Sequence, residues 1–404
     1  MTEPTPPIEL LGTKARFAGA VVLPDGFAAR LAAVCECRTD DGSTAEASRD
    51  WWPMALHWAL AGQVPQRAAV VARPTDTVQV SAVLAVCNDA GVPVTTAGGR
   101  SGVVGGSVPL FGGVVLDTTA LQGVLSVDTV SGLVEVWAGT FGPDLEAELR
   151  GAHCLTVGHF PQSFDIATVG GWVACRGAGQ YSTRYGKIEA MVAGLEVVLA
   201  DGTVVRTGGS PAAAQGPDLT QLFVGSEGTL GVVTKVLLRA HPLPAAERRA
   251  AYSFDTFEDG IEACRRVLRR GATPAVLRLY DAIETQRGQN GDGSNCALLV
   301  LDEGDPAIID AVMGIVAEEC AGAAALPVEL IEKWMHHRND TSALQGLTRK
   351  GFVVDTLEIA APWAALPGIF TAATAALMAV PHARVASCHL SHSYLDGACL
   401  YFTF

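Results

Sequence analysis

The sequence AGGRSGVVGGS, residues 97–107, follows directly after an expected strand, Val92–Thr96. Glycines at this density permit positive φ angles and a close approach of the main chain, so backbone N–H groups can converge on an anion such as a pyrophosphate. The stretch is not a Walker loop, because no Gly-Lys-Ser/Thr follows it, and it lacks the G-x-G-x-x-G order of a Rossmann turn. Taken alone, it fits a flexible turn between strands equally well.

The chain around this loop has 404 residues, of which 49% are hydrophobic and 17% charged, and a formal net charge of −14. This composition is typical of a globular protein with a substantial core, and the length suggests two or three packing units. Binding to a nucleic-acid backbone needs clustered Lys and Arg. The acidic balance therefore argues against a nucleic-acid partner.

The sequence carries neither a membrane-span pattern nor a signal-peptide pattern. The longest uncharged runs, such as 101–116, are interrupted by glycine and proline and are shorter than the ~20 apolar residues that cross a bilayer. Residues 1–11 carry acids and prolines in place of a basic patch and an apolar run. The ten cysteines are scattered without a CxxC pair, so we expect reduced thiols, no metal site and a cytoplasmic location.

Apolar runs and turn residues divide the chain into three parts. Residues 1–63 are expected to form an N-terminal helical segment, with helices near Phe27–Cys35 and Arg49–Leu60. Residues 64–242 alternate short Val- and Leu-rich runs with helical windows, which predicts an α+β domain, and Asp201-Gly202 predicts a hairpin. The expected strands are Ala68–Ala72, Val92–Thr96, Gly113–Asp117, Val124–Val127, Leu133–Val136, Leu195–Ala200 and Thr234–Leu238, and the expected helices are Val78–Ala90 and Asp144–Leu149.

Residues 243–404 are expected to form a second domain after a short linker, Leu243–Glu247. Helical windows at 257–270 and 307–319 alternate with strand-like segments at 275–279 and 297–301, which predicts an α/β sheet with helices on one face. The chain ends on Leu400–Phe404, an apolar segment typical of a core strand. Because termini usually lie exposed, we expect the polypeptide to be truncated at the C-terminus.

Three further segments combine small residues, which admit a ligand near the backbone, with hydroxyl or amide donors. They are 158–163 leading into 168–172, then 175–181, and then 225–232. Together with the glycine loop they indicate a cofactor cage.

These motifs resemble the FAD-binding domain of the PCMH, or vanillyl-alcohol oxidase, type of flavoprotein. The segments Gly98–Ser101, Thr168–Gly171 and Gly225–Gly231 occur in the family's order across residues 68–241. The resemblance implies two α+β subdomains that bury an extended FAD and a separate cap domain over the flavin. It implies these cofactor-binding residues: Ala97, Gly98, Gly99, Arg100, Ser101, Gly102, Val103, Gln162, Ser163, Phe164, Asp165, Ile166, Ala167, Thr168, Cys175, Arg176, Gly177, Ala178, Glu227, Gly228, Thr229, Leu230, Gly231, Val232 and Val233.

Within these flavoproteins the chain is most similar to the alkyldihydroxyacetonephosphate synthase (alkylglycerone-phosphate synthase) family. The resemblance implies an FAD-dependent transferase that exchanges the acyl group of acyl-dihydroxyacetone phosphate for a long-chain alcohol, giving an ether-lipid precursor without net redox change. FAD acts there as a covalent scaffold. The matching residues are Gly158–Pro161, Tyr185–Glu189, Gly216–Leu219, Arg278–Asp281, Glu358, Pro362-Trp363, Ser391–Tyr394 and Gly397–Phe402.

The same resemblance assigns catalytic roles to Tyr401, His159 and Arg278 and a substrate-binding role to Arg338. Arginine suits a phosphate because its planar fork binds two oxygens. We expect the two arginines to lower the pKa of Tyr401, and His159, with an ordinary pKa of ~6.5, to shuttle protons at neutral pH. His389 and His392 are reserve candidates.

Each assignment has a structural alternative. Arg278 can form an ion pair with Asp281, Arg338 can be an exposed helical residue, and Tyr401 can be a packing residue of a strand. For the cofactor, relatives that attach FAD covalently often use a histidine in a Gly-Gly-His-Ser context, whereas Arg100 follows Gly99 here. We therefore predict non-covalent FAD.

Two other functions stay open at this point. The same FAD domain serves D-2-hydroxy acid dehydrogenases and oxidases of the D-lactate or glycolate type, in which Arg278 would clamp the carboxylate and His159 would take the hydroxyl proton. A flavin-binding remnant without activity is the third reading. Peripheral membrane association and a homodimer are also open, although a charge of −14 gives no electrostatic help at an anionic leaflet.

Overall fold

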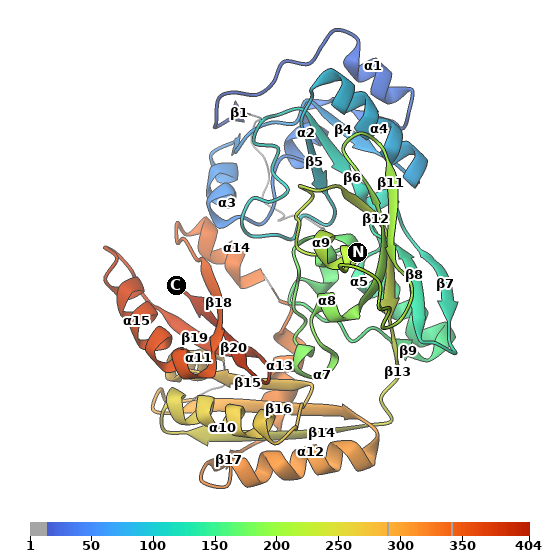
Figure 1. Ribbon diagram of the computed structural model, residues 1–404. Coiled ribbons are helices and arrows are strands. Elements are labelled where there is room, and N and C mark those ends of the chain that lie inside the picture. The colour runs from blue at the N-terminus through green and yellow to red at the C-terminus, as the bar shows by residue number, and fades with distance from the viewer. Residues whose placement is uncertain (1–13, 289–290, 341) are drawn as a thin grey trace.

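The computed structural model describes residues 14–288, 291–340 and 342–404. Figure 1 shows two bodies, an upper one that holds the blue-to-green half of the chain and a lower one coloured yellow to red. We call residues 14–242 the upper body and residues 243–404 the lower body. Residues 1–11, where we expected no signal peptide, lie outside the described residues.

A four-stranded sheet forms the first part of the upper body. Its order is β2-β4-β6-β5, with β4, β6 and β5 parallel and β2 antiparallel. The bounds are β2 (Glu36–Arg38), β4 (Val70–Arg73), β6 (Val114–Asp117) and β5 (Val94–Ala97). Helix α4 (Thr77–Ala90) begins at Asp76, whose side chain accepts from the Gln79 N–H.

The residues expected to form an N-terminal helical segment share this sheet and its core. Strand β2 pairs with β4, and α1 (Phe27–Ala32) buries Phe27 and Leu31 in the same hydrophobic cluster as Val70 and Leu116. A short amphipathic helix has no stability of its own in water, so it packs on the nearest apolar sheet face.

A five-stranded antiparallel sheet completes the upper body, in the order β11-β10-β12-β8-β7. The strands are β11 (Val204–Gly208), β10 (Val192–Val198), β12 (Val232–Arg239), β8 (Leu133–Trp137) and β7 (Val124–Asp128). The hairpin predicted at Asp201-Gly202 is confirmed, because β10 and β11 pair directly and Gly202 has a φ of 88°.

The lower body is built on a seven-stranded sheet in the order β17-β14-β16-β15-β19-β20-β18. Its strands are β14 (Ala246–Phe254), β15 (Val276–Tyr280), β16 (Cys296–Gly304), β17 (Ala324–Leu326), β18 (Thr356–Pro362), β19 (Ser387–Ser393) and β20 (Gly397–Thr403). The expected linker is shorter than predicted, since β14 already begins at Ala246.

Helices cover both faces of this sheet, not one face as we expected. Helices α10 (Phe257–Arg269), α12 (Pro306–Glu319) and α15 (Leu366–Met378) pack on the face that carries Leu277 and Val300. Helix α13 (Glu329–His337) packs on the opposite face, where Ile331 and Trp334 contact a cluster that includes Leu299. Because the strands are buried on both sides, β15 and β16 are apolar almost throughout.

The remaining elements are short or peripheral. They are β1 (Lys14–Ala15), α2 (Asp41–Glu46), α3 (Pro53–Leu60), β3 (Gln63–Val64), η1 (Thr118–Ala120), α5 (Gly142–Glu148), η2 (Leu149–His153), β9 (Leu155–Thr156), η3 (Phe164–Ile166), α6 (Val169–Ala174), α7 (Ser182–Tyr185), α8 (Ile188–Met191), α9 (Leu219–Phe223), β13 (His241–Pro242), α11 (Ala282–Gly288), α14 (Ser342–Arg349) and η4 (Trp363–Ala365). All ten cysteines are free thiols. Among the described residues, no helix is both long and apolar enough to cross a membrane.

Candidate active site

The glycine loop and the segment 162–168 lie against each other. A Cβ on Gly98 would lie 2.3 Å from Thr168 Oγ1, and a Cβ on Gly99 would lie 1.9 Å from the Ile166 carbonyl oxygen. Only glycine lets two backbones approach this closely. Two of the segments predicted to bind the cofactor are therefore in direct contact.

The other two predicted segments join the same region. The Glu227 N–H donates to Ala174 O at 3.0 Å, and Gly228 lies beside Thr96 at the end of β5. Arg100, Arg176 and Glu227 have φ angles of 52°, 55° and 51°, which are rare for residues with a side chain. Turns of this left-handed kind direct successive backbone N–H groups toward one point, where they can bind an anion.

Buried polar atoms without a protein partner gather in this region. Among the described residues they include Arg100 Nε, Trp172 Nε1 and both ring nitrogens of His159. Buried polar groups in folded proteins nearly always have a hydrogen-bond partner. These atoms therefore fit a bound polar molecule, and a flavin dinucleotide with its pyrophosphate suits the donors and the glycine-lined backbone.

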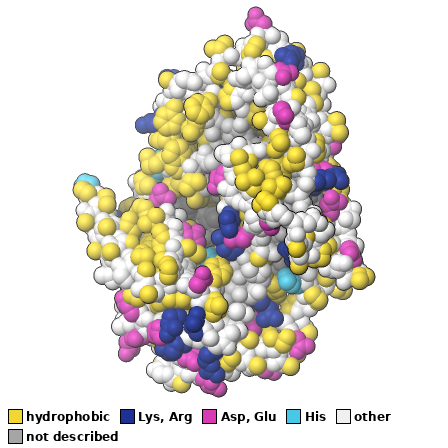
Figure 2. All heavy atoms as spheres, viewed as in Figure 1, with side chains coloured by type: hydrophobic (Ala, Val, Ile, Leu, Met, Phe, Trp, Pro, Cys, Tyr) yellow, Lys and Arg dark blue, Asp and Glu magenta, His cyan; other side chains and the backbone are white. Residues whose placement is uncertain are grey.

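The side chains that are candidates for catalysis lie on one face of the lower sheet. Along β15 the side chains of Leu277 and Leu279 enter the core under α10, so that of Arg278 projects from the opposite face. The same alternation applies to β20, where Leu400 and Phe402 are in that core and Tyr401 is not. In Figure 2, charged side chains gather where the two bodies meet.

Strand register aligns four of these side chains across the sheet. Glu358 pairs with Tyr401, Tyr401 with His389, and His389 with Tyr280, so one row crosses β18, β20, β19 and β15. The rings of His389 and Tyr401 are stacked with centroids 5.0 Å apart. We call Glu358, Tyr401, His389 and Tyr280 the polar row.

A β-bulge places a second histidine beside this row. The pairing of β19 with β20 shifts between Leu390 and His392. An unbroken strand would turn these two side chains to the same face. Instead, His392 Nδ1 lies 2.9 Å from Ser182 Oγ in the upper body, and its Nε2 lies 3.9 Å from Glu358 Oε1.

Arg278 is held by neutral groups, not by the ion pair with Asp281 that was its structural alternative. Its Nε donates to the Tyr280 hydroxyl at 2.7 Å and its Nη2 lies 2.6 Å from His389 Nε2. Asp281 instead accepts the backbone N–H groups of Glu284 and Cys388, each at 2.7 Å. Within the described residues, Arg278 thus keeps its positive charge without a carboxylate in ion-pair contact.

The contacts of His389 define its tautomer. A guanidinium can only donate, so Nε2 of His389 accepts from Arg278, and Nδ1 donates to Glu284 Oε2 at 2.8 Å. Burial lowers the pKa of His389, and the nearby Arg278 charge lowers it further. Burial acts to raise the pKa of Glu284, but the attraction of His389 and Arg278 outweighs it and the net shift is downward.

Tyr401 does not have the lowered pKa that we expected. Burial raises the pKa of its phenol, and the Arg278 charge opposes this only in part. Tyr401 is therefore a protonated hydroxyl at neutral pH, a proton donor, in the protein without bound substrate.

His159 also differs from the expectation of a proton shuttle. It is 1% exposed, packs edge-on against Trp172 with centroids 4.7 Å apart, and burial alone lowers its pKa to about 3. At neutral pH its imidazole is uncharged, so it offers one donor and one acceptor to a ligand.

Arg338 lies at the C-terminus of α13 and reaches into the upper body. Its Nη1 donates to Gln180 at 3.2 Å, and its guanidinium lies 5.5 Å from the Phe160 ring centroid and 5.6 Å from that of Trp334. Arg278 lies 6.0 Å from the centroid of the same Trp334 ring, so both arginines lie beside one indole. Arg338 lines a cavity of about 430 Å³ between the bodies.

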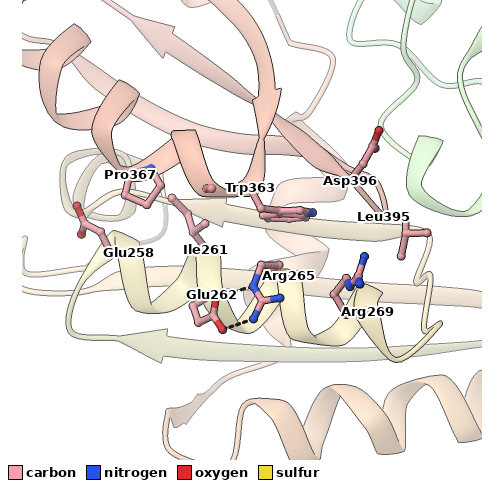
Figure 3. A pocket seen from close by; sticks show the side chains of 10 residues that line it. Glu258, Ile261, Glu262, Arg265, Arg269, Trp363, Pro367, Leu395 and Asp396 are labelled. Carbon is pink, nitrogen blue, oxygen red and sulfur yellow. Dashed lines mark hydrogen bonds and ion pairs between the residues drawn. The ribbon is translucent and has the colours of Figure 1, made fainter.

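A larger cavity lies elsewhere and is separate from this site. Its volume is about 670 Å³, and it is lined by α10, Trp363 and the turn at Leu395 and Asp396 (Figure 3). Helix α10 covers the sheet face opposite to Arg278. In Figure 3 the only ion pair drawn joins Arg265 to Glu262. The α10 wall of the larger cavity therefore lies on the opposite face of the lower sheet from the polar row.

Sequence reasoning missed Glu284 and gave Glu358 no role. Glu284 lies one turn beyond β15 in α11, and its contact with His389 spans 105 positions of the chain. A period-two reading of β18 and β20 together would have placed Glu358 on the face of Tyr401.

Comparisons with known proteins agree with this architecture. A family model described as an FAD binding domain matches residues 68–208, and one for the C-terminal domain of FAD linked oxidases matches residues 243–404. The FAD-linked oxidoreductase YgcU of Escherichia coli O157:H7 is 34% identical over 83% of this chain and 72% of its own length. The chain therefore belongs to the FAD-linked oxidase family of PCMH-type flavoproteins, and FAD is its cofactor.

More specific relatives have two different activities in their names. Alkyldihydroxyacetonephosphate synthase of Dictyostelium discoideum is 27% identical over 85% of this chain and 62% of its own length. Glycolate oxidase subunit GlcD of Bacillus subtilis is 33% identical over 53% of this chain and 45% of its own length. A solved structure of an alkyldihydroxyacetonephosphate synthase has a TM-score of 0.83 over 98% of this chain and 79% of that chain, at 23% identity, which shows a shared fold.

Proposed function

We propose that the protein is an alkylglycerone-phosphate synthase-like transferase. It would exchange the acyl group of acyl-dihydroxyacetone phosphate for a long-chain alcohol, so that a fatty acid leaves and an ether bond forms with no net oxidation. Bound FAD supplies an electrophilic ring system that can stabilise the reacting carbon. The substrates are small lipid molecules, and we place the reaction in the cytoplasm.

The observation that carries this proposal is the polar row together with Arg278. Within the described residues, Arg278 presents a positive charge that Tyr280 and His389 orient and that no carboxylate contacts as an ion pair. A phosphate dianion is a suitable partner for such a charge, because guanidinium–phosphate hydrogen bonds are charge-assisted. Arg338, beside the same Trp334 ring, would bind a second part of the same substrate.

Residues of the polar row would carry out the proton transfers of this exchange reaction. Tyr401 is protonated and can donate to a leaving oxygen, and Glu358 lies directly across the strand pair. Burial raises the pKa of Glu358, which makes it a suitable acceptor for the proton of the entering alcohol. His159 and His392, both neutral, would hold groups in place by hydrogen bonds and would not carry charge.

The direct test is conversion of hexadecanoyl-dihydroxyacetone phosphate and labelled hexadecanol into labelled alkyl-dihydroxyacetone phosphate. We expect product with the wild-type protein and a loss of at least about 100-fold with Arg278→Gln, since both binding and orientation of the phosphate depend on it. Arg269→Gln is the matched control, because Arg269 is exposed and lines the separate cavity on α10. Absence of product from FAD-loaded wild-type protein would refute the transferase assignment.

A D-2-hydroxy acid dehydrogenase or oxidase is the second candidate, favoured by the similarity to the glycolate oxidase subunit. In that reaction Arg278 would bind the carboxylate, and the flavin would accept a hydride equivalent. Anaerobic mixing with D-lactate, glycolate or a long-chain 2-hydroxy acid separates the two, because only the redox enzyme bleaches the flavin absorbance.

A further inference from the structure

The segment 46–52 lies before the part of the chain that the FAD-binding family model matches, which begins at residue 68. It nevertheless packs against the glycine loop. The Trp51 N–H donates to Gly102 O at 3.0 Å, and a Cβ on Gly105 would meet the Trp52 ring at 3.2 Å. The segment therefore forms one wall of the region where the cofactor-binding turns converge.

Three consecutive side chains of this segment are buried with an unsatisfied polar atom. Arg49 is 5% exposed, Asp50 0% and Trp51 5%. Within the described residues, Arg49 Nη1, Asp50 Oδ2 and Trp51 Nε1 have no hydrogen-bond partner, and the same is true of Arg100 Nε in the glycine loop. Leaving a buried donor or acceptor unpaired is costly, so a run of such atoms indicates a ligand.

The protein supplies carboxylates to both guanidinium groups of this cluster. Glu46 Oε2 accepts from Arg49 Nη2 at 2.6 Å, and Glu46 Oε1 lies 3.9 Å from Arg100 Nη2. Besides Glu46, the charges of Asp117 and Asp50 also act on Arg100. Asp50 Oδ1 accepts the Trp52 N–H at 3.0 Å, whereas Oδ2 has no hydrogen-bond partner within the described residues.

We propose that Arg49, Asp50 and Trp51, together with Arg100, form an additional part of the FAD site that holds its polar middle section. The unpaired atoms are three donors and one acceptor. Phosphate oxygens accept from Arg49, Trp51 and Arg100, and a sugar hydroxyl donates to Asp50. The proposal concerns the cofactor alone and does not depend on which reaction the enzyme performs.

The release of FAD from the holoenzyme tests this assignment without any substrate. Trp51→Phe removes one N–H and keeps the ring, and Arg49→Gln removes the charge at similar length. We expect both variants to release FAD at least about tenfold faster than wild type on dilution, monitored by the fluorescence of the freed flavin. Arg38→Gln is the matched control, because Arg38 is a half-exposed arginine of the same region, paired with Glu36.

Thermal melting with and without excess FAD distinguishes a binding role from a structural one. If the segment binds FAD, the added cofactor raises the Tm of Trp51→Phe and Arg49→Gln less than it raises that of wild type. Wild-type release rates in both variants, with a Tm lowered equally in the presence and absence of FAD, would overturn the proposal. If Arg49→Gln does not fold, Trp51→Phe and Asp50→Asn decide the outcome by the same two measurements.

Discussion

Replacing Gly99 by alanine is expected to separate the two loops that form the centre of the flavin site. The new Cβ would lie 1.9 Å from the Ile166 carbonyl oxygen and 3.2 Å from Ala167 Cα. Both obstacles are backbone atoms, which no side-chain rotation can move. To reach an ordinary contact of ~3.4 Å, the loops must move apart by about 1.5 Å.

The magnitude follows from this displacement. Overpacking of a well-packed contact costs about 1–3 kcal/mol, and for a large domain each kcal/mol lowers Tm by about 2–4 °C. The neighbouring Gly98 also lies close to this segment, since a Cβ there would be 2.3 Å from Thr168 Oγ1, so the glycine loop has little room to slide along its neighbour. We therefore expect a lower Tm together with release of FAD that is at least about tenfold faster.

Gly151→Ala is the control in the same body. Its Cβ would meet no atom within 4 Å, and Gly151 has no positive φ. Differential scanning fluorimetry and FAD release after dilution are measured on both variants and on wild type. Equal behaviour of Gly99→Ala and Gly151→Ala would refute the argument that the loop contact requires glycine.

Three further predictions concern the chemistry and the pH dependence of stability. Arg278→Lys keeps the charge but cannot contact Tyr280 and His389 with one planar group, so kcat/KM in the exchange assay should fall about 100-fold, while Arg269→Lys stays at the wild-type value. Tyr401→Phe should reduce the same kcat/KM by a similar factor without changing the rate of FAD release; a wild-type rate would remove Tyr401 from the proton transfers. Burial acts to raise the pKa of Glu196, but hydrogen bonds from Thr77, Arg206 and Lys235 hold this pKa at about 2. The ionised carboxylate therefore stabilises the fold above pH ~4.5, and this stabilisation is lost as the pH falls toward 2. Glu196→Gln should consequently lower the Tm at pH 7 and differ less from wild type at pH 2.5.

The polar row shows which parts of the candidate site the sequence predicts and which parts it does not. The alternation of apolar residues on β15 and β20 is enough to turn Arg278 and Tyr401 away from the helix-covered core. Strands β14, β18 and β19 were not predicted, because polar residues interrupt them: β14 contains Glu-Arg-Arg and β19 reads SCHLSHS. In β19 these polar residues form the functional face itself. The polar positions that made this strand difficult to predict are therefore also positions of the candidate site.

The sequence by itself determined the features that depend on the backbone conformation of single residues. The glycine loop, the Asp201-Gly202 hairpin and the order of the cofactor motifs follow from positions that only glycine or a turn-forming residue can occupy. The tertiary structure decided which side chains that are distant in the sequence contact each other, and which of them are protonated or charged. Arg278 contacts His389 and not the Asp281 carboxylate of its structural alternative, Tyr401 has a raised pKa where a lowered one was expected, and His392 lies on the other face of the sheet because of a bulge. These outcomes depend on strand register and on burial, which are set by the packing of the whole sheet and not by neighbouring residues along the chain.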